Sequence, residues 1–520
     1  MIATAFSAEL LSRLAPTSGH DAFARDLLVL PMLLPLAAAC LSVLSSSLLW
    51  RRTLMLGTTV LLVAVSGWLL LMADLGHVLV YRLGNWPVPV AIVLSLDRLS
   101  ALLLLLTAVV ATGSAWAALR GDDQHGPHFH AAFLLLIAGV NGAFLAGDLF
   151  NLFVSFELLL IASYGLLVFG ATPTRVRSGV HYVVLNLVGS SIFLVGIGML
   201  YSVTGTLNLA ELAQRVALLD APSAAFARSG ALLLFVVFAL KAALVPFSFW
   251  LPAAYSAASP PVAALFAILT KVGVYAIVRM HTFVVGTDAG HSADLYGDWL
   301  WPMALLTVGF GALAAVGTRS VRRLQSALLV MSVGTMLASM AIGSEAGLAA
   351  GLFYLVHSTI AAAAMFLIAA LSEQRDTPRR WTGLLFFAGA VAVAGLPPLS
   401  GFLGKVLILQ ALPVDGRLPV MWTVVLGSSL LAVIALSRRG AALFWGAVEA
   451  PETPTLPRIS EPRSARRAPL SRVPPTALLL VLVVLTVGAG TLSNYTHRTA
   501  QQLLAPGHIR SQILNTPGGR

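Results

Sequence analysis

The sequence has one cysteine, only three lysines and few charged residues of either sign. Because Cys40 has no second cysteine to pair with, no intrachain disulfide can form, and metal binding by cysteine is not expected. Charged residues make up 10% of the 520 residues, whereas hydrophobic residues make up 58%. This composition excludes a soluble globular protein and is typical of a polytopic membrane protein.

Sequence motifs of several enzyme classes are also absent. There is no GxxxxGK[ST] motif, so direct ATP hydrolysis is not expected. The 11 histidines form no HExxH or Cys/His cluster, and the His-rich stretch "GDDQHGPHFH" at 121–130 has a loose pattern. We therefore predict neither a metal site nor a cofactor, and we expect that the chain is not an enzyme.

The net charge of +11 does not indicate a nucleic-acid partner. The arginines are spread through short loops between apolar segments, whereas nucleic-acid-binding proteins concentrate them on one element. Residues 1–25 lack the basic start and apolar core of a cleaved signal, so we expect the first membrane helix to direct insertion. The partner expected from composition alone is the lipid bilayer.

At about 20 apolar residues per crossing, the sequence predicts an all-α protein with about fourteen transmembrane helices. An even number of crossings puts both termini on one side of the membrane. Loops on the other side hold more arginines, so the positive-inside rule places both termini on the periplasmic or external side of a bacterial inner membrane. The expected helices span 26–49, 53–76, 89–119, 130–147, 149–170, 179–202, 229–254, 260–280, 298–317, 324–342, 346–372, 382–412, 419–447 and 476–494.

Two of these segments contain proline near the middle. Pro246 lies in "FVVFALKAALVPFSFWLP", and Pro397 and Pro398 lie in "VAGLPPLSGFLGKVLI". Proline removes a backbone hydrogen bond and crowds the preceding turn, so we expect both helices to break; for either site alone, a packing kink is the alternative. In transporters, paired broken helices in corresponding parts of inverted repeats mark the transport site.

The two breaks fall in the fourth helices of two five-helix units, which we predict to be inverted repeats. The chain then divides into an N-terminal tail with three helices at 1–129, a first repeat at 130–281 and a second repeat at 298–447. The Pro-, Glu- and Arg-rich segment 448–475 is expected to be a cytoplasmic linker without regular structure. The last helix and the C-terminal tail occupy 476–520.

The three lysines, Lys241, Lys271 and Lys405, all lie inside hydrophobic segments. A charged side chain in the bilayer costs at least about 2.5 to 3.5 kcal/mol, so each lysine is a candidate functional group. Arginine stays protonated at any accessible pH, whereas a buried lysine can release and recapture a proton. We therefore predict proton transfer at the lysines; the alternative is that buried charge pairs simply hold helices together.

Two more ionisable residues are predicted near the middle of the bilayer. Glu157 is the only carboxylate deep in a predicted helix, and a carboxylate beside Lys241 would favour the charged lysine. Weakening that pair would eject the proton, so the pair is predicted to act as a switch. His357 titrates near neutrality and is a candidate relay between the lysines; a hydrogen-bonded core histidine is the alternative.

Other polar residues near the helix ends are expected to have structural roles. Asp148 starts the helix that carries Glu157 and is expected to cap it. His181 lies close to a helix end, and Asp97 and Arg98 lie in the first third of the third predicted helix. We expect packing or interface roles for the adjacent Asp97 and Arg98, and we keep Asp148, His181 and Ser248 as accessory candidates.

Four long stretches closely resemble the D-type subunits of the Mrp, or Pha, multisubunit cation/proton antiporters, a family similar to the antiporter-like membrane subunits of respiratory complex I. The resemblance covers roughly residues 80 to 450 and implies a fourteen-helix protein with two inverted five-helix repeats. It also implies a large hetero-oligomer that exchanges cytoplasmic sodium or potassium for external protons. The stretches are "AGVNGAFLAGDLFNLFVSFELLLIASYGLLVFG", "HYVVLNLVGSSIFLVGIGMLYSVTGTLNLAELA", "LKAALVPFSFWLPAAYSAASPPVAALFAILTKVGVYAIVRM" and "GLPPLSGFLGKVLILQA".

The resemblance implies that the essential ionisable residues of this family correspond to the three lysines, Glu157 and His357 of this chain. The chain departs from the wider superfamily at Ser248, where "PFHxWLP" with histidine is common, and at Ala362, where many relatives have a lysine five positions after the helix-11 histidine. The relay then depends more on water between its members. The implied residues are Glu157 in helix 5, Lys241 in helix 7, Lys271 in helix 8, His357 in helix 11 and Lys405 in helix 12.

The residues and the resemblance together predict a proton-translocating subunit of an antiporter that exports Na⁺ or K⁺ in exchange for H⁺. Its expected partners are a large A-type subunit and small membrane subunits. One alternative is a proton-pumping membrane subunit of a complex I-like or hydrogenase redox enzyme, in which the same charges respond to electron transfer elsewhere. Another is a scaffold in such an assembly that transports nothing itself.

Overall fold

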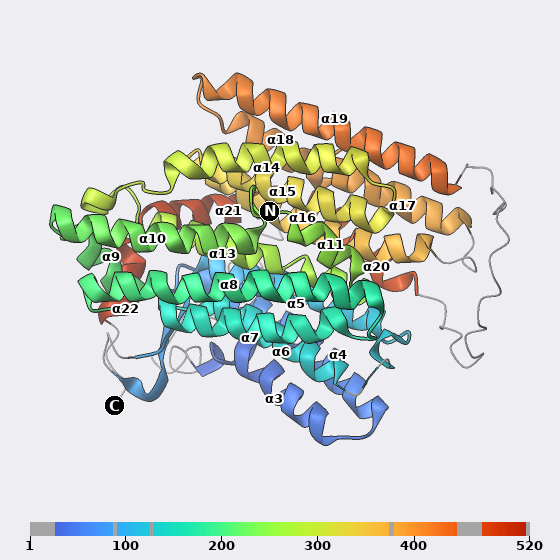
Figure 1. The fold of residues 1–520 in the computed structure, drawn as a ribbon, viewed down its shortest axis with the longest axis horizontal. Helices are drawn as coiled ribbons and strands as arrows, with labels where there is room; N and C mark the ends of the chain where they lie inside the picture. Colours follow the sequence, from blue (N-terminus) through green and yellow to red (C-terminus); the bar gives the residue numbers. More distant parts are fainter. Residues whose placement is uncertain are drawn as a thin grey trace, which may run out of the picture.

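The computed structural model describes residues 26–86, 91–124, 126, 128–373, 379–444 and 471–515. The expectations for the N-terminal tail and for most of the 448–475 linker fall outside these residues. Within them the chain forms an elongated bundle of helices that run roughly along one direction (Figure 1). The predicted class, an all-α polytopic membrane protein, is confirmed.

The helices carry the labels of Figure 1, and several are shorter or longer than the apolar runs suggested. The α-helices are α3 Leu30–Leu44, α4 Leu48–Asp74, α5 Arg98–Ala118, α6 Phe129–Leu145, α7 Leu149–Val168, α8 Pro173–Thr204, α9 Leu209–Ala217, α10 Ala221–Ala242, α11 Trp250–Ala257, α12 Pro260–Phe266, α13 Leu269–Phe283, α14 Gly297–Gly317, α15 Val321–Met340, α16 Glu345–Ser372, α17 Arg379–Ala394, α18 Ser400–Gln410, α19 Arg417–Phe444, α20 Val473–Val487, α21 Ala489–Leu504 and α22 Gly507–Asn515.

The expected count of fourteen crossings is not confirmed. In the described part of the chain, nine helices are long and apolar enough to cross a membrane, or ten if the bent pair α20 and α21 forms one crossing. The count is lower because α3 and α6 are shorter than 18 residues, because the second break divides the predicted segment 382–412 into the short helices α17 and α18, and because α15 is not among the nine spans. The division into two five-helix repeats stays a prediction.

Two spans form the centre of the bundle. The apolar windows of Pro260–Phe283 and of Glu345–Ser372 are fully buried by surrounding helices. In contrast, only a third of the corresponding window of α4 or α19 is buried, and their outer faces present leucine, valine and tryptophan side chains. A helix that is apolar all round and buried belongs to the interior of a membrane bundle, whereas the outer helices face lipid or a partner.

The segment predicted as one helix at 89–119 is instead a strand followed by a helix. Strand β1, Leu79–Arg82, pairs antiparallel with strand β2, Val93–Leu96. Asp97 then accepts a hydrogen bond from the Ser100 amide and starts α5 as its N-cap. A short apolar run such as "VLSL" fits a strand as well as a buried helix, which is why the pattern alone was misleading.

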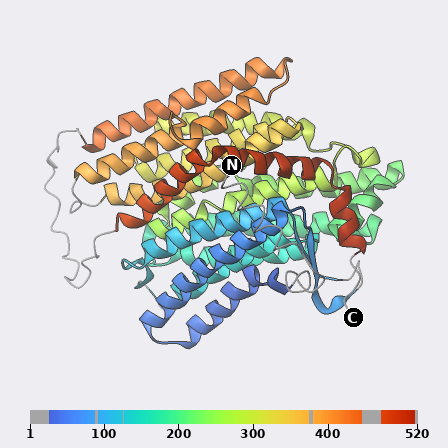
Figure 2. The same ribbon diagram turned by 180° about the vertical axis from the view of Figure 1, so that it is seen from behind.

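The last predicted helix, 476–494, is also corrected. Helix α20 ends at Val487, and the chain bends by 78° before α21 begins at Ala489. Helix α21 is amphipathic, with one apolar face packed against α5, α13 and α16. Figure 2 shows this C-terminal segment in red in front of the bundle, with α22 near its right-hand end.

Both predicted helix breaks are present. Helix α10 ends at Ala242, the next residue adopts a left-handed conformation with φ of 59°, and α11 starts only at Trp250, so Pro246 lies in the break. Helix α17 ends at Ala394 and α18 starts at Ser400, with the two adjacent prolines between them. The second break begins at Gly395, where φ is +71°, a conformation that favours glycine.

Candidate functional site

Lys241 lies in the last turn of α10 and is buried. Its ammonium nitrogen donates a hydrogen bond of 2.8 Å to Oδ1 of Asn186 on α8. The same nitrogen lies 6.0 Å from the centre of the Phe156 ring, near the limit for a cation–π contact. The lysine predicted to carry a proton is therefore held in the interior by a neutral amide oxygen.

Glu157 on α7 is half-buried and accepts a hydrogen bond from the Ser190 hydroxyl. Among the described residues no ion pair within 4.0 Å joins Glu157 to Lys241, so the direct pair expected from the sequence is not formed in this structure. The reason is local: Asn186 and Ser190 are one helical turn apart on α8, and each binds one of the two charged groups. Helix α8 thus connects the carboxylate to the lysine.

The first break exposes backbone groups that find partners on other elements. The Val245 amide donates to Oγ1 of Thr307 on α14 at 2.9 Å, and the Trp250 indole donates to the Leu240 carbonyl at 3.1 Å. Ser248, the first departure from the wider superfamily, is buried, and its carbonyl accepts from the Leu251 amide. The break is thus an ordered element of the bundle.

Lys271 lies near the start of α13 and is 0% exposed. Its nitrogen donates to Oγ1 of Thr270 at 3.3 Å, and no carboxylate of the described residues forms an ion pair with it. Helix α13 packs tightly on the end of α10, since a Cβ added at Gly273 would lie 2.4 Å from the Ala242 amide nitrogen. The helices that carry the first two lysines are therefore in direct contact.

His357 on α16 is buried and contacts both sides of the second break. Its Nε2 lies 3.1 Å from the Ala392 carbonyl oxygen, and its Nδ1 lies 2.8 Å from the Ser400 hydroxyl. A carbonyl oxygen only accepts, so Nε2 carries a hydrogen and, in the neutral ring, Nδ1 accepts from the serine. There is no room for a side chain beside this ring, because a Cβ added at Gly401 would lie 2.5 Å from Nε2.

Lys405, on α18, reaches back across the break. Its nitrogen donates to the Ala394 carbonyl at 2.7 Å and to the Ser429 hydroxyl of α19 at 2.8 Å. Ala394 is the last residue of α17, so the ammonium group lies where helix carbonyls are unpaired and carry negative partial charge. The structure thus brings His357 and Lys405 to the same break.

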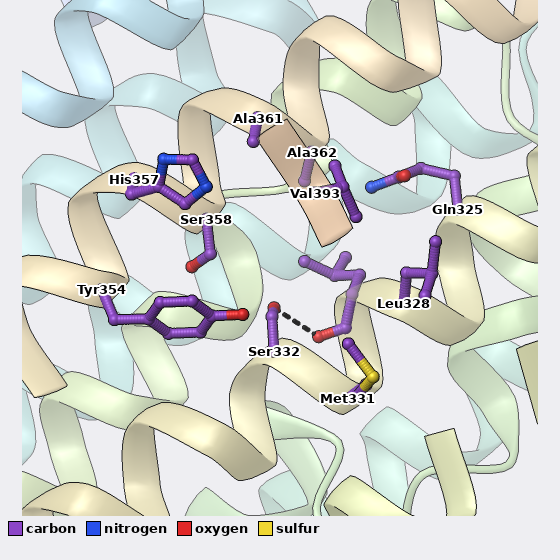
Figure 3. A pocket seen from close by; sticks show the side chains of 11 residues that line it. Gln325, Leu328, Met331, Ser332, Tyr354, His357, Ser358, Ala361, Ala362 and Val393 are labelled. Carbon is purple, nitrogen blue, oxygen red and sulfur yellow. Dashed lines mark hydrogen bonds between the residues drawn. The ribbon is translucent and has the colours of Figure 1, made fainter. Parts of the chain in front are cut away.

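A small cavity adjoins His357 between α15, α16 and α17 (Figure 3). Ala362, the second departure from the wider superfamily, lines this cavity together with Ser332 and Tyr354. Gln325 also lines it, and its Oε1 has no hydrogen-bond partner among the described residues. A polar group of this kind is a suitable partner for an ordered water molecule.

In the described part of the chain, two of the accessory candidates, Asp148 and His181, form no hydrogen bond or ion pair with the lysines. Asp148 caps α7, because its Oδ1 accepts from the Asn151 amide at 2.6 Å, as the sequence predicted. Its other oxygen accepts from the Val93 amide at 3.4 Å. His181 lies on the exposed face of α8 and does not face the interior.

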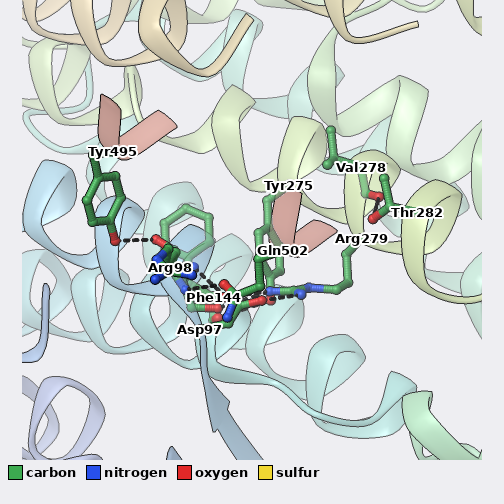
Figure 4. A network of polar contacts seen from close by, with 10 residues as sticks. Asp97, Arg98, Phe144, Tyr275, Val278, Arg279, Thr282, Tyr495 and Gln502 are labelled. Atoms are coloured by element: carbon green, nitrogen blue, oxygen red, sulfur yellow. Dashed lines mark hydrogen bonds and ion pairs between the residues drawn. The ribbon is translucent and has the colours of Figure 1, made fainter. Parts of the chain in front are cut away.

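One buried ion pair was not predicted. Arg279 of α13 binds Asp97 through two hydrogen bonds, of 2.6 and 3.0 Å, and its guanidinium lies 5.1 Å from the centre of the Tyr275 ring (Figure 4). The sequence pattern indicates arginines spread through loops, whereas this arginine is 5% exposed inside the bundle. Its place within an apolar predicted helix, 260–280, was the available signal.

A second cluster lies at the loop between α5 and α6. We call Arg52, Asp123 and His130 the loop cluster: the guanidinium donates to Asp123 at 2.6 and 2.9 Å, and Nε2 of His130 lies 3.2 Å from the same carboxylate. Burial alone would raise the pKa of Asp123, but the hydrogen bond from His130 and the ion pair with Arg52 outweigh it and lower that pKa. No three potential metal ligands of the described residues cluster there or elsewhere in this part of the chain.

Sequence comparisons relate the chain to known antiporter subunits. A family model described as NADH:quinone oxidoreductase/Mrp antiporter, TM, matches residues 146–432. A Rhizobium meliloti protein, the probable D subunit of a K⁺/H⁺ antiporter, is 38% identical, with 94% of this chain and 98% of that protein covered. The D subunit of a Bacillus subtilis Na⁺/H⁺ antiporter is 33% identical, with 94% and 99% covered.

Solved structures have the same fold. A chain of the Mrp complex from Dietzia sp. DQ12-45-1b superposes with a TM-score of 0.82 at 27% identity, covering 95% of this chain and all of that chain. A chain of an archaeal membrane-bound sulfane sulfur reductase gives 0.81 at 26% identity, covering 94% and 99%. Respiratory complex I from Thermus thermophilus, at 24% identity and a TM-score of 0.71 over 92% and 99%, shares the fold. The chain therefore belongs to the NADH:quinone oxidoreductase/Mrp antiporter membrane family.

Proposed function

We propose that this chain is the proton-translocating subunit of a multisubunit antiporter that exports Na⁺ or K⁺ in exchange for H⁺. The observation that carries the proposal is the set of buried lysines beside two broken helices, in a chain whose sequence relatives are named as D-type antiporter subunits. A buried ionisable group is costly in a bilayer and is retained where its charge is used.

In this mechanism Lys241 is the group that gains and loses a proton in the first half of the chain. Its partner in the structure is the neutral Asn186, and Glu157 is bound one turn further along the same helix. Approach of the carboxylate stabilises the ammonium form, and its withdrawal favours release of the proton. Lys271, on the helix packed against the end of α10, is the next acceptor.

His357 and Lys405 continue the route at the second break. The Ala392 carbonyl occupies the Nε2 side of the imidazole and cannot take a proton from it, so exchange takes place on the Nδ1 side, where the Ser400 hydroxyl can rotate. The Ser429 hydroxyl, which accepts from Lys405, is the neutral side chain beside the lysine, and a water molecule in the cavity beside His357 would support transfer on the histidine side.

The membrane potential supplies the energy if more protons enter than cations leave. Each elementary charge that crosses a potential of 100 mV releases about 2.3 kcal/mol. We propose the bacterial inner membrane as the location, with both termini outside the cytoplasm. The proposed partners are a large A-type subunit and small membrane subunits, and the proposal requires neither a catalytic centre nor a cofactor in this chain.

A second candidate is a redox-driven proton pump. It is favoured by the nearly equal similarity of the fold to the sulfane sulfur reductase, an archaeal respiratory membrane complex. The two candidates differ in their neighbours: an antiporter subunit co-purifies with other membrane subunits, whereas a pump subunit co-purifies with iron–sulfur proteins. Identification of the co-purified chains by mass spectrometry separates them.

The central experiment replaces Lys241 in the complete complex. Everted vesicles from a strain without its own antiporters report proton movement on addition of Na⁺ or K⁺. We expect Lys241→Arg to be almost as inactive as Lys241→Ala, because arginine keeps the charge but does not release the proton. Arg228→Lys, an exposed exchange on the same helix, is the matched control. Normal exchange by the arginine variant would contradict the mechanism.

A further inference from the structure

One face of α8 carries three polar side chains at intervals of four residues, Tyr182, Asn186 and Ser190. All three are buried, although neighbouring positions on the helix are exposed valines and leucines. At 1.5 Å per residue, successive members lie about 6 Å apart along the axis. The face is directed at α7 and α10, the helices that carry Glu157 and Lys241.

The amide of Asn186 is oriented by two hydrogen bonds. Its Nδ2 donates to the Tyr182 carbonyl at 2.7 Å, and its Oδ1 accepts from Lys241 at 2.8 Å. Reversing the amide would place an N–H group against the lysine nitrogen and an oxygen against a carbonyl, so both bonds would be lost. The side chain, 3% exposed, therefore presents an acceptor to Lys241.

The surrounding packing keeps this acceptor in place. The Tyr182 hydroxyl lies 3.0 Å from the Ser163 hydroxyl of α7, and its ring lies 5.2 Å from that of Trp250 on α11. Gly189 lies between Asn186 and Ser190 on α8. A Cβ added there would lie 2.9 Å from Cδ2 of Leu240 and 3.9 Å from the Lys241 nitrogen. Helices α8 and α10 thus approach closely beside Lys241.

We propose that Asn186 is a positioning residue that holds Lys241 in both of its charge states. This inference rests on the proposed function, in which Lys241 gains and loses a proton, and assigns Asn186 the role of positioning that lysine. A neutral amide oxygen accepts a hydrogen from either an ammonium or an amine, so the lysine keeps its place when its proton leaves. A carboxylate at this position would bind the ammonium far more strongly than the amine.

Ser190 has the complementary role toward Glu157. By donating its hydroxyl to the carboxylate, it holds Glu157 one turn away from the acceptor of Lys241. The two charged groups are then neighbours but are not locked together, and a small movement of α7 against α8 changes their separation. The separation of Glu157 and Lys241 thus sets how strongly the lysine holds its proton, while Asn186 keeps the lysine nitrogen in place.

The test compares two substitutions with opposite effects on pH dependence. In everted vesicles containing the complete complex, Asn186→Asp should move the half-maximal exchange to higher pH by about one unit or more, because the added carboxylate retains the proton on the lysine. Leucine is similar in size to asparagine but has no hydrogen-bond acceptor, so Asn186→Leu should move the half-maximal exchange to lower pH. A loss of activity with an unchanged pH profile in both variants would overturn the proposal.

A second measurement does not depend on transport. Asn186→Leu is combined with Lys241→Met, and the thermal unfolding of the purified complexes is compared in a double-mutant cycle. Strong non-additivity supports the contact, and additive losses overturn it. If the unmodified complex moves no protons on addition of cations, the proposed function fails while this cycle still tests Asn186. Ser191→Ala, on the exposed face of α8, should behave as the unmodified protein.

Discussion

Replacing Asp97 by asparagine removes one charge from a buried ion pair while preserving the shape of the side chain. Asp97 is 2% exposed and Arg279 is 5% exposed, and two hydrogen bonds of 2.6 and 3.0 Å join them. Removing one partner of such a pair leaves an uncompensated buried charge, which costs about 3 to 5 kcal/mol. The N-cap of α5 survives, because the remaining side-chain oxygen still accepts from the Ser100 amide.

The pair is tested by a double-mutant cycle. Asp97→Asn and Arg279→Met should each lower the apparent melting temperature of the purified complex substantially, since each leaves the opposite partner unpaired. The double variant Asp97→Asn/Arg279→Met should be more stable than the sum of the single losses predicts, because no buried charge remains. Thermal unfolding in detergent, followed by the amount of folded complex that remains, gives the comparison.

The stability of the Asp97–Arg279 pair also concerns the proposed transport, because α13 carries Lys271 as well as Arg279. Arg279 lies eight residues after Lys271 on α13, about 12 Å along the helix axis, so the ion pair fixes the position of the helix that carries this lysine. Single variants that melt like the unmodified complex, or a double variant whose loss is additive, would refute the reasoning. An Asp97→Ala variant adds the loss of the cap, about 1 kcal/mol more.

Two further changes test other parts of the structure. Gly401→Ala should abolish exchange and also lower the amount of assembled complex, because the new Cβ would lie 2.5 Å from both Nε2 of His357 and the Ala392 carbonyl oxygen; Gly427→Ala, with open space around it, is the control in the same vesicle assay and should do neither. The lowered pKa of Asp123 means that the loop cluster contributes stability above the ordinary carboxyl pKa and loses it as pH falls through the folded value. The melting temperature of the complex should therefore drop below about pH 4, and by less in Asp123→Asn; equal drops would contradict the assignment.

The parts of the fold that the sequence predicted are those governed by hydropathy and proline. Apolar runs of about 20 residues are read directly as membrane helices, and Pro246 and the adjacent Pro397 and Pro398 fixed the two breaks. The β1–β2 hairpin and the bend after Val487 were not predicted. Each depends on a few residues whose pattern fits more than one structure until tertiary contacts select one.

The candidate site was predictable only for its charged members. Charges in apolar segments are conspicuous because burial is expensive, so all three lysines, Glu157 and His357 could be named from the sequence. Their partners Asn186, Ser190 and Ser429 are neutral, and similar residues occur throughout the helices at positions facing lipid. Nor does a linear pattern show that Asp97 meets an arginine 182 residues away.

The two lysines lie on opposite sides of their breaks along the chain. Lys241 precedes its break and lies in the last turn of α10, whereas Lys405 follows its break and binds the carbonyl at the end of α17. The Lys405 ammonium thus binds the C-terminal end of a helix, where unpaired carbonyls favour a cation, whereas the Lys241 ammonium binds the Asn186 amide oxygen of α8. In the proposed mechanism, a shift of a half-helix at its break changes the surroundings of its lysine and therefore how strongly that lysine holds a proton. Under the proposed mechanism each break and its lysine act together, and Asn186 of α8 and Ser429 of α19 are the side chains of neighbouring helices that contact the two lysines.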